Sequence, residues 1–291
     1  MRTSEAMWFR DNFRLAGIVL FFLLAVMPLL LGVGYALLYS LGVTGILSEG
    51  LTLVHWTEVL SDAENLFSFG YSVYIATTTM GIAVMAALFI TLQLGGRLNR
   101  GALSYISYFP LAIPAIVAAL FIFQLFSKAG LFSRISYQVG FTEAIQSFPG
   151  LVNDRWAIGI IAAHVMLAVP FFVIYFRNIY RSENLDRYRE LALSLGSNPL
   201  QTAFRVQVPV LLYRALPTIV LYFLFVLGSY EIPLILGQES PQMVSVLAIR
   251  KLRKFNLMDI PEAYIIAILY LIVILGLVLL LFRKRRLSYD L

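Results

Sequence analysis

The chain has 291 residues, of which 60% are hydrophobic and 13% charged, whereas soluble domains carry roughly 25% charged residues; this composition predicts an all-α integral membrane protein. The net charge is +6. Basic cytoplasmic loops account for such a positive charge in a membrane protein, so we expect no nucleic-acid partner. Because the chain has no cysteine and only 2 histidines, we expect neither disulfides nor a metal site.

Six apolar stretches are long enough to cross a bilayer, which takes about 20 residues. They cover residues 15–41, 70–95, 104–126, 156–180, 211–237 and 263–282. The first is longer than the apolar region of a signal peptide, about 7 to 15 residues. The first loop, LTLVHWTEVLSDAENL, has spaced apolar residues and predicts a short interfacial helix, and the third loop, residues 127–155, has room for another.

The basic residues predict the orientation of these spans, because cytoplasmic loops carry an excess of lysine and arginine. The N-terminus, the second and fourth loops and the C-terminal tail hold 15 of the 22 basic residues, and the remaining loops hold 7. We therefore expect both termini on the cytoplasmic side. One outer loop does not follow the rule, since the fifth carries Arg250, Lys251, Arg253 and Lys254.

The fourth loop contains a polar segment, RYRELALSLGSNPLQTAFRVQVP, at residues 187–209. Apolar residues at helical spacing form a stripe that begins just before this segment and continues into it. They are Leu185, Tyr188, Leu191 or Ala192, and Leu195. Gly196 is a typical helix terminator. Asn198, Pro199 and Gln201 form an N-cap, a first helical position and a capping box. The segment predicts two short helices with a fixed bend, the second ending in VQVP.

Two roles fit such a segment. It can lie on the cytoplasmic membrane surface with its arginines against lipid phosphate, or it can dock in a groove on another protein. We favour docking, because lipid contact does not explain the rigid bend.

The same residues carry a resemblance. Their spacing is that of the EAA loop (E-A-A, three residues, G, nine residues, I, one residue, L-P), with matches at Glu190, Ala192, Gly196, Val206, Val208 and Pro209. Leu191 replaces the second motif residue, and the two valines are apolar replacements. The segments TLVHWTEVLSD, PLAIPAIVAALFIFQLF, AHVMLAVPFFVIYFRN and GSYEIPLILG also read like their counterparts. From about Leu51 to its C-terminus, the chain resembles a permease subunit of a type I ATP-binding-cassette importer.

The resemblance implies six transmembrane helices of the permease fold, with residues 1–50 as a cytoplasmic segment and first helix, residues 51–291 as the permease domain, and coupling helices at about residues 182–209. It implies a prokaryotic inner-membrane protein that works with two ATPase subunits, a second permease of a different chain, an extracytoplasmic binding protein and membrane lipid. The expected ATPase-coupling residues are Glu190, Ala192, Gly196, Pro199, Val206 and Pro209. Since the chain has no G-x-x-x-x-G-K-[ST] loop, we expect no catalytic residue here and place ATP and Mg in the partner subunits.

Glu231 is unusual because a carboxylate inside a span is costly and by default marks a pathway, a relay or a buried pair. Tyr230 and Glu231 precede Pro233, which breaks a helix. These three residues are candidates for the solute path; alternatively, Glu231 braces the kink or lies near the outer surface. The phrase GSYEIPLILG is similar to permeases for polyamines, ferric iron and phosphonates, and a carboxylate on the path suits a cationic solute. We predict no more than a small hydrophilic solute.

The four cations of the fifth loop have two interpretations. They can contact anionic lipid headgroups through a short amphipathic helix with Ile249, Leu252 and Phe255. Alternatively, they can contact an acidic lobe of the binding protein, because complementary charge raises the rate at which two proteins meet. We favour the binding protein.

Two other functions fit a six-span protein. A secondary transporter coupled through Glu231 is expected to show inverted repeats and paired broken helices, which the sequence does not show. A membrane scaffold would use the polar segment to bind a different cytoplasmic protein. Neighbouring genes for an ATPase and a secreted binding protein would separate these from the importer.

Overall fold

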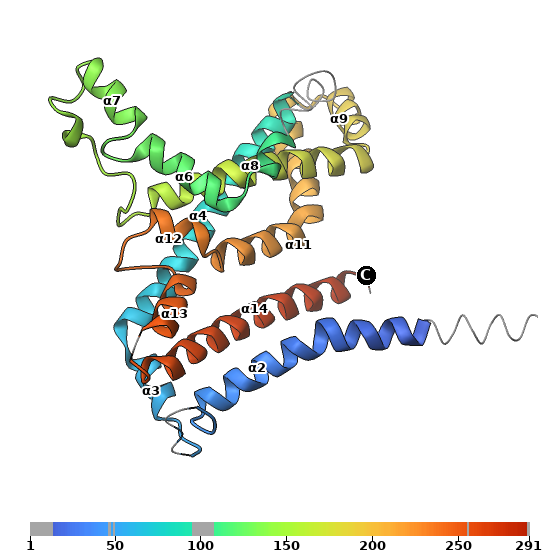
Figure 1. Ribbon diagram of the computed structural model, residues 1–291. Coiled ribbons are helices and arrows are strands. Elements are labelled where there is room, and N and C mark those ends of the chain that lie inside the picture. The colour runs from blue at the N-terminus through green and yellow to red at the C-terminus, as the bar shows by residue number, and fades with distance from the viewer. Residues whose placement is uncertain (1–13, 46–47, 49, 95–107, 255, 290–291) are drawn as a thin grey trace, which may run out of the picture. The chain divides into compact units, whose positions relative to one another are not determined.

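The computed structural model describes residues 14–45, 48, 50–94, 108–254 and 256–289, and their regular elements are all helical (Figure 1). Six helices are long and apolar enough to cross a membrane. They span Arg14–Ser40, Ala63–Gln93, Ala115–Gln138, Ile158–Ser182, Pro199–Leu227 and Asp259–Leu280. The six predicted spans are thus confirmed, with shifted boundaries. The predictions for the N-terminal cations Arg2 and Arg10 and for the second loop, with Arg97 and Arg100, lie outside the described residues.

The chain divides into two compact units. The first consists of Met1–Asp62 and Ala248–Val273. Its described part contains a π turn η1 (Phe22–Val26), α2 (Met27–Ser40), α3 (Val54–Ser61) and the beginning of α14 (Asp259–Tyr289). The rings of Tyr35 and Tyr39 lie 5.9 and 5.0 Å from the ring of Tyr264. Aromatic contacts at these distances stabilise packing beyond the area they bury, and here they join α2 to α14.

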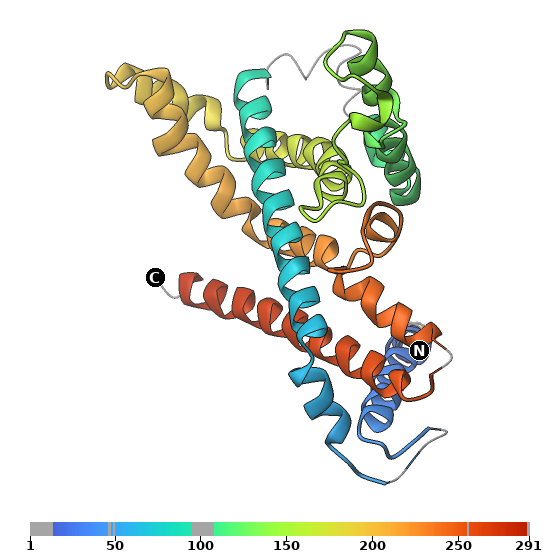
Figure 2. The same cartoon turned by 90° about the vertical axis from the view of Figure 1, so that its left-hand side faces the viewer.

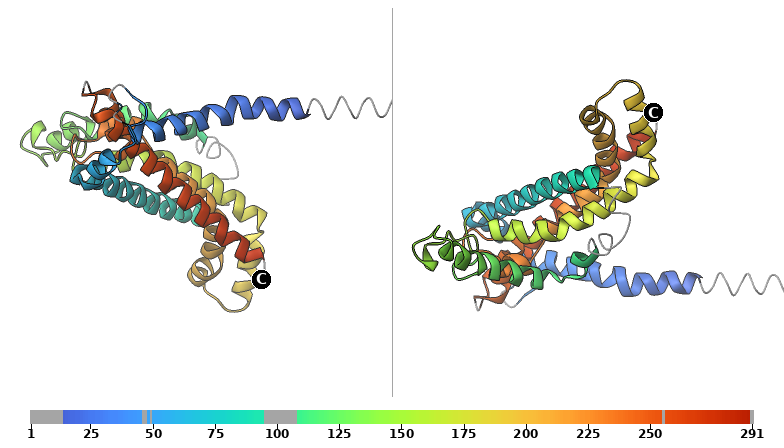
Figure 3. Two further views of the ribbon diagram at one scale, coloured as in Figure 1. Left: turned by 90° about the horizontal axis from the view of Figure 1, so that it is seen from below. Right: turned by 90° about the horizontal axis from the view of Figure 1, so that it is seen from above.

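The second unit consists of Ala63–Leu247 and Ile274–Leu291. Its core lies between α4 (Ala63–Leu94), α8 (Ile158–Ser182) and α11 (Val208–Leu227), and α4 and α8 run along each other (Figures 2 and 3). Phe172 and Phe176 are fully buried in it. Small buried residues on all three helices let the backbones approach closely; they are Ala83, Ala87, Ala168 and Ala215.

The remaining helices of this unit are short. Apart from the helical turns within residues 185–207, they are η3 (Phe109–Ala112), α6 (Ala115–Phe126), α7 (Leu131–Gln138), η4 (Ile145–Ser147), α12 (Glu231–Leu236) and the first four residues of α13 (Val244–Arg253). α12 packs against α6 and α8. The helices α3 and α7 confirm the short elements predicted in the first and third loops.

The fifth span is shorter than predicted. We expected it to continue to Gly237, but α11 ends at Leu227 and a new helix, α12, begins at Glu231. The proline ring clashes with the carbonyl four residues earlier in a regular helix, and for Pro233 that residue is Ser229. The break falls at this position, and the Ser229 carbonyl instead accepts a hydrogen bond from the Ser245 hydroxyl.

Candidate functional site

The predicted polar segment forms a helical hairpin. It consists of α9 (Leu185–Ser194), α10 (Pro199–Thr202) and the π turn η5 (Ala203–Gln207), and we call residues 185–207 the coupling hairpin. It follows α8 directly and leads into α11, so both of its ends join helices of the second unit's core (Figure 1).

Gly196 ends α9 as predicted. Its φ angle is +86°, in the left-handed region that glycine adopts without strain. The amide of Gly196 donates to the carbonyl of Leu193 at 3.0 Å, and that of Ser197 to the carbonyl of Ala192 at 3.1 Å. This pair of bonds is the Schellman arrangement, which satisfies carbonyls that a helix end leaves unpaired.

The start of α10 is fixed by a capping box, also as predicted. The amide of Gln201 donates to the Asn198 side chain at 2.7 Å, and the amide of Asn198 donates to the Gln201 side chain at 3.2 Å. Pro199 occupies the first helical position. The Ser197 hydroxyl lies 2.6 Å from the buried Thr202 hydroxyl and 2.7 Å from the Ala192 carbonyl, a bond across the bend that motif spacing does not predict.

The hairpin is anchored to the core by contacts distant in sequence. Leu185 is fully buried in the core cluster. Gln207 donates to the Tyr180 hydroxyl at 2.9 Å, and this hydroxyl donates to Asp186 at 3.0 Å. These bonds link α8, α9 and the π turn, so the hairpin is fixed to the transmembrane helices on both of its sides.

An ion pair connects the residues on either side of the hairpin, between the end of α8 and the beginning of α11. Arg214 of α11 binds Glu183 through two nitrogens, at 2.9 and 3.2 Å. Such a two-point pair holds its geometry better than a single contact. Sequence reasoning missed this pair and the Tyr180 bonds, because nothing in the local pattern connects residues 27 or 31 positions apart.

The apolar stripe of the hairpin divides into a buried and an exposed part. Leu185 is buried, whereas Tyr188, Leu191 and Leu195 are 54%, 60% and 87% exposed. The second arm adds Leu200 and Phe204, 69% and 67% exposed, which the helical spacing did not single out. Large apolar groups exposed on a rigid backbone are typical of a protein-binding surface.

Glu190 is exposed in the middle of α9. Among the described residues it forms no ion pair, although Arg187 lies one turn before it on the same helix. Its carboxylate faces outward, where a partner protein can reach it.

The end of the hairpin differs from the prediction. The second helix does not stop at VQVP: Pro199–Leu227 is one continuous helical stretch that includes the π turn. Pro209 in a regular helix would clash with the Arg205 carbonyl, and Arg205 lies inside the wider π turn. This turn, which holds the motif residue Val206 and the buried Gln207, lets the helix pass the proline unbroken.

Glu231 is exposed in the first turn of α12, while Tyr230 is half-buried and Pro233 is buried. Within the described chain the Glu231 side chain has no ion pair or hydrogen bond, so it does not brace the break. Leu234, one turn later, is also exposed, at 54%. Both side chains therefore face away from the helices that α12 packs against.

Three of the four cations of the fifth loop lie on α13 and Lys254 follows it directly, so the predicted amphipathic helix is present, although Phe255 lies outside the described residues. One of them contradicts the docking expectation: Lys251 is buried, with its ammonium bound to Glu262 and 3.7 Å from Asp62. Lys254 pairs with Asp259 at 3.3 Å. Intramolecular carboxylates thus neutralise two of the four charges, which explains how this loop tolerates a basic sequence. Arg253 is exposed, and Arg250 is partly exposed.

Comparison with known proteins then decides the family. The model of the family described as binding-protein-dependent transport system inner membrane component matches residues 79–286, which is 208 of the 291 residues. The chain belongs to this family. It is the membrane permease of an ATP-binding-cassette importer that works with a binding protein, and ATP is hydrolysed by partner subunits.

Individual permeases are similar over part of the chain. The molybdenum transport system permease protein ModB of Azotobacter vinelandii is 23% identical over 168 residues, covering 58% of this chain and 70% of the relative. The sulfate transport system permease protein CysT of Synechocystis sp. is 25% identical over 225 residues, covering 71% and 75%. A crystal structure of a bacterial transporter that imports alginate contains a permease chain of the same fold, with a TM-score of 0.74 at 16% identity, covering 98% of this chain and 97% of the other.

Proposed function

We propose that the coupling hairpin is the surface through which this permease receives the force of ATP hydrolysis. The observation that carries the proposal is the combination of a backbone fixed at both sides of the bend with exposed apolar side chains and an exposed Glu190. In this arrangement Gly196 and Pro199 set the bend, the Ala192 carbonyl accepts the bonds from Ser197, Val206 lies in the π turn, Pro209 lies in the first turn of α11, and Glu190 contacts the ATPase. The test is whether ATPase subunits still co-purify with the permease when the bend is distorted at Gly196.

The permease is placed with both termini and the hairpin in the cytoplasm. The excess of cations at those sites supports this orientation. The second permease of the complex is a different chain, which the subunit masses of a purified complex would establish.

The orientation can be tested by cysteine labelling, since the natural chain has no cysteine. Ser194 lies exposed on the hairpin and Glu143 lies exposed in the third loop. We expect a membrane-impermeant maleimide to label Glu143→Cys in intact cells, but Ser194→Cys only after the membrane is permeabilised. The reverse pattern would refute the orientation, and labelling of both in intact cells would show that the hairpin is accessible from outside.

The solute is a small hydrophilic molecule carried by an extracytoplasmic binding protein. The relatives named above are permeases for sulfate and molybdenum, and a 28% identical stretch occurs in a thiamine permease of Brucella suis; we propose a small oxyanion as the first candidate. A polyamine or another cation is the second candidate, since the phrase GSYEIPLILG is similar to permeases of the polyamine, iron and phosphonate group. Glu231 favours it, because an exposed carboxylate on the path would repel an anion.

Uptake by cells that express the whole transporter separates the two candidates. We expect labelled sulfate or molybdate to enter, and Glu231→Gln to speed this uptake, because removing a negative charge lowers the barrier for an anion. If spermidine enters instead, Glu231→Gln should slow it several-fold. Glu239→Gln, a nearby exposed carboxylate after α12, is the control. Unchanged kinetics for every solute with Glu231→Gln would remove this residue from the path.

A further inference from the structure

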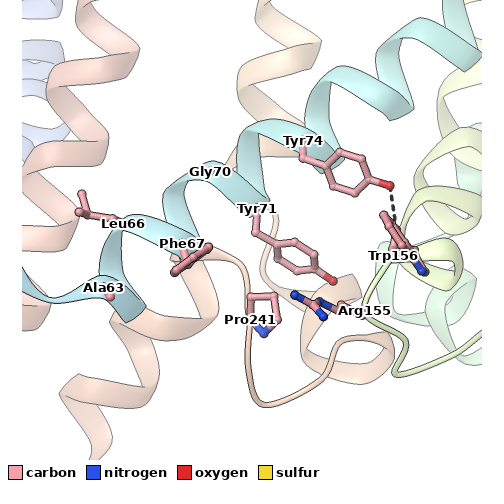
Figure 4. A pocket seen from close by; sticks show the side chains of 9 residues that line it. All are labelled: Ala63, Leu66, Phe67, Gly70, Tyr71, Tyr74, Arg155, Trp156 and Pro241. Atoms are coloured by element: carbon pink, nitrogen blue, oxygen red, sulfur yellow. Dashed lines mark hydrogen bonds between the residues drawn. The ribbon is translucent and has the colours of Figure 1, made fainter.

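The second unit contains a hollow of about 780 Å³ at the beginning of α4 and α8. Figure 4 shows Phe67, Tyr71 and Tyr74 on α4, and Arg155 and Trp156 on the segment that leads into α8. We call it the aromatic hollow. Its volume is that of a small-molecule site, about 300–1,000 Å³. It lies at the end of α8 opposite the coupling hairpin, so the docking of an ATPase does not account for it.

Hydrogen bonds fix the walls of the aromatic hollow. The Tyr74 hydroxyl donates to the Trp156 carbonyl at 3.2 Å, and the Tyr71 hydroxyl to the Asp154 carbonyl at 3.5 Å. The Asp154 carboxylate accepts from the amides of Trp156 and Ile158, each at 2.9 Å. Asp154 is therefore engaged in capping α8, and among the described residues that line the hollow Arg155 is the one that carries a charge.

The length of α4 leaves room for the hollow in the headgroup layer of the membrane. The second span, Ala63–Gln93, has 31 residues, which gives a length of about 46 Å at about 1.5 Å per residue. A bilayer is about 40–45 Å thick with its headgroups and about 30 Å without them. The span is therefore longer than the hydrocarbon core, and the hollow lies at one end of it, on the first turns of α4 and just before α8, which begins after Trp156 and Ala157.

The side chains that line the hollow are those that headgroups bind. Trp156 is 68% exposed, Phe67 71% and Tyr74 40%, and tryptophan and tyrosine are enriched at this depth because their rings are apolar and their edges polar. The guanidinium of arginine matches a phosphate with two parallel hydrogen bonds. A cation among exposed aromatic rings complements a ligand with a negative head and an apolar body.

We propose that the aromatic hollow binds one anionic phospholipid, with its phosphate at Arg155 and its glycerol region against Trp156 and Tyr74. The acyl chains of the lipid cover the exposed apolar surface of Phe67 and Leu66 on α4. The phosphate of the lipid is a negatively charged partner for Arg155, and the residues that line the hollow do not provide one.

The experiment uses the assembled transporter in phosphatidylcholine vesicles with about 5% of a photoactivatable phosphatidylglycerol or, in parallel, of the matching phosphatidylcholine. Lipid adducts are counted by mass spectrometry on the peptides that contain residues 63–74 and 155–156. We expect about fivefold more adduct with phosphatidylglycerol, which corresponds to about 1 kcal/mol for one cation near anionic lipid. Arg155→Gln should lower the ratio to about one, and Arg155→Lys should retain part of it.

Arg134→Gln is the matched control, because Arg134 is an exposed arginine of α7 that bonds to its own Ala129 carbonyl and does not line the hollow. It should keep the wild-type ratio. A wild-type ratio of one, or an unchanged ratio in Arg155→Gln, overturns the proposal. So does loss of the preference when inorganic phosphate replaces chloride at equal ionic strength, since the site would then take soluble phosphate. If the ratio is one and Arg155→Gln abolishes stimulation by the binding protein, the hollow is a protein contact.

Discussion

Gly196→Val is expected to separate ATP hydrolysis from transport. The position has φ +86°, and a Cβ added there would meet no atom within 4 Å, so the cost of the substitution is one of backbone conformation and not of space. A β-branched residue in the left-handed region costs about 1–3 kcal/mol. The bend relieves this strain by opening, which breaks the bonds from Gly196 and Ser197 to α9. We expect uptake to fall at least about tenfold, since each 1.4 kcal/mol of distortion is a factor of about ten in an equilibrium, and ATPase subunits to be lost on purification.

Gly196→Asn is the control for this experiment. Asparagine is the residue that most readily replaces glycine at a helix end in the left-handed conformation, and the open surroundings of Gly196 accept its side chain. It should keep most of the uptake and the ATPase association. Both variants should reach the membrane in wild-type amounts, because the transmembrane helices are untouched. Full uptake and full ATPase association in Gly196→Val would refute the role of the hairpin.

Lys251→Gln is expected to destabilise the first unit without affecting the hairpin. The lysine side chain is 7% exposed and serves two carboxylates, Asp62 and Glu262. Removing one partner of a buried pair typically costs about 3–5 kcal/mol. Since the Asp62 and Glu262 side chains are 40% and 21% exposed, water compensates part of this loss, and we expect about 2 kcal/mol. The measurement is the thermal unfolding midpoint of the purified complex, which should fall by several degrees.

Two further variants separate the ion pair from a general effect of charge. Lys254→Gln removes an equal charge from the same loop, but its side chain is 50% exposed, and exposed pairs contribute about 0–1 kcal/mol; its midpoint should hardly move. Lys251→Gln combined with Glu262→Gln should cost less than the sum of the two single changes, because each removes the same interaction. Additive costs, or equal midpoints for Lys251→Gln and Lys254→Gln, would contradict the buried pair.

The amino-acid sequence was sufficient for most features that depend on neighbouring residues. Apolar runs of about 20 residues have few alternatives to a transmembrane helix, because a bilayer leaves no other way to satisfy the backbone. The bend at Gly196 and the capping box of Asn198 and Gln201 were also predictable, since these bonds close within a few residues of one chain segment. The sequence also predicted that Pro233 breaks the fifth helix. The break lies near Ser229, four residues earlier, because the proline ring would clash with the carbonyl of that residue in a regular helix.

The tertiary structure decided which of these residues are available to a partner. Leu185 and Leu195 belong to one stripe, yet one is fully buried and the other 87% exposed, because only the first reaches the core between α4, α8 and α11. Lys251 and Arg253 belong to one basic run, yet the first is buried against Asp62 and Glu262, carboxylates that lie far apart in the chain. Tyr180 with Gln207, Glu183 with Arg214, and the residues of the aromatic hollow are likewise brought together by helix packing alone. Local sequence determines helices and caps, because their bonds close between neighbouring residues. Burial and long-range pairing depend instead on which helices pack together, and no single segment of the sequence specifies this packing.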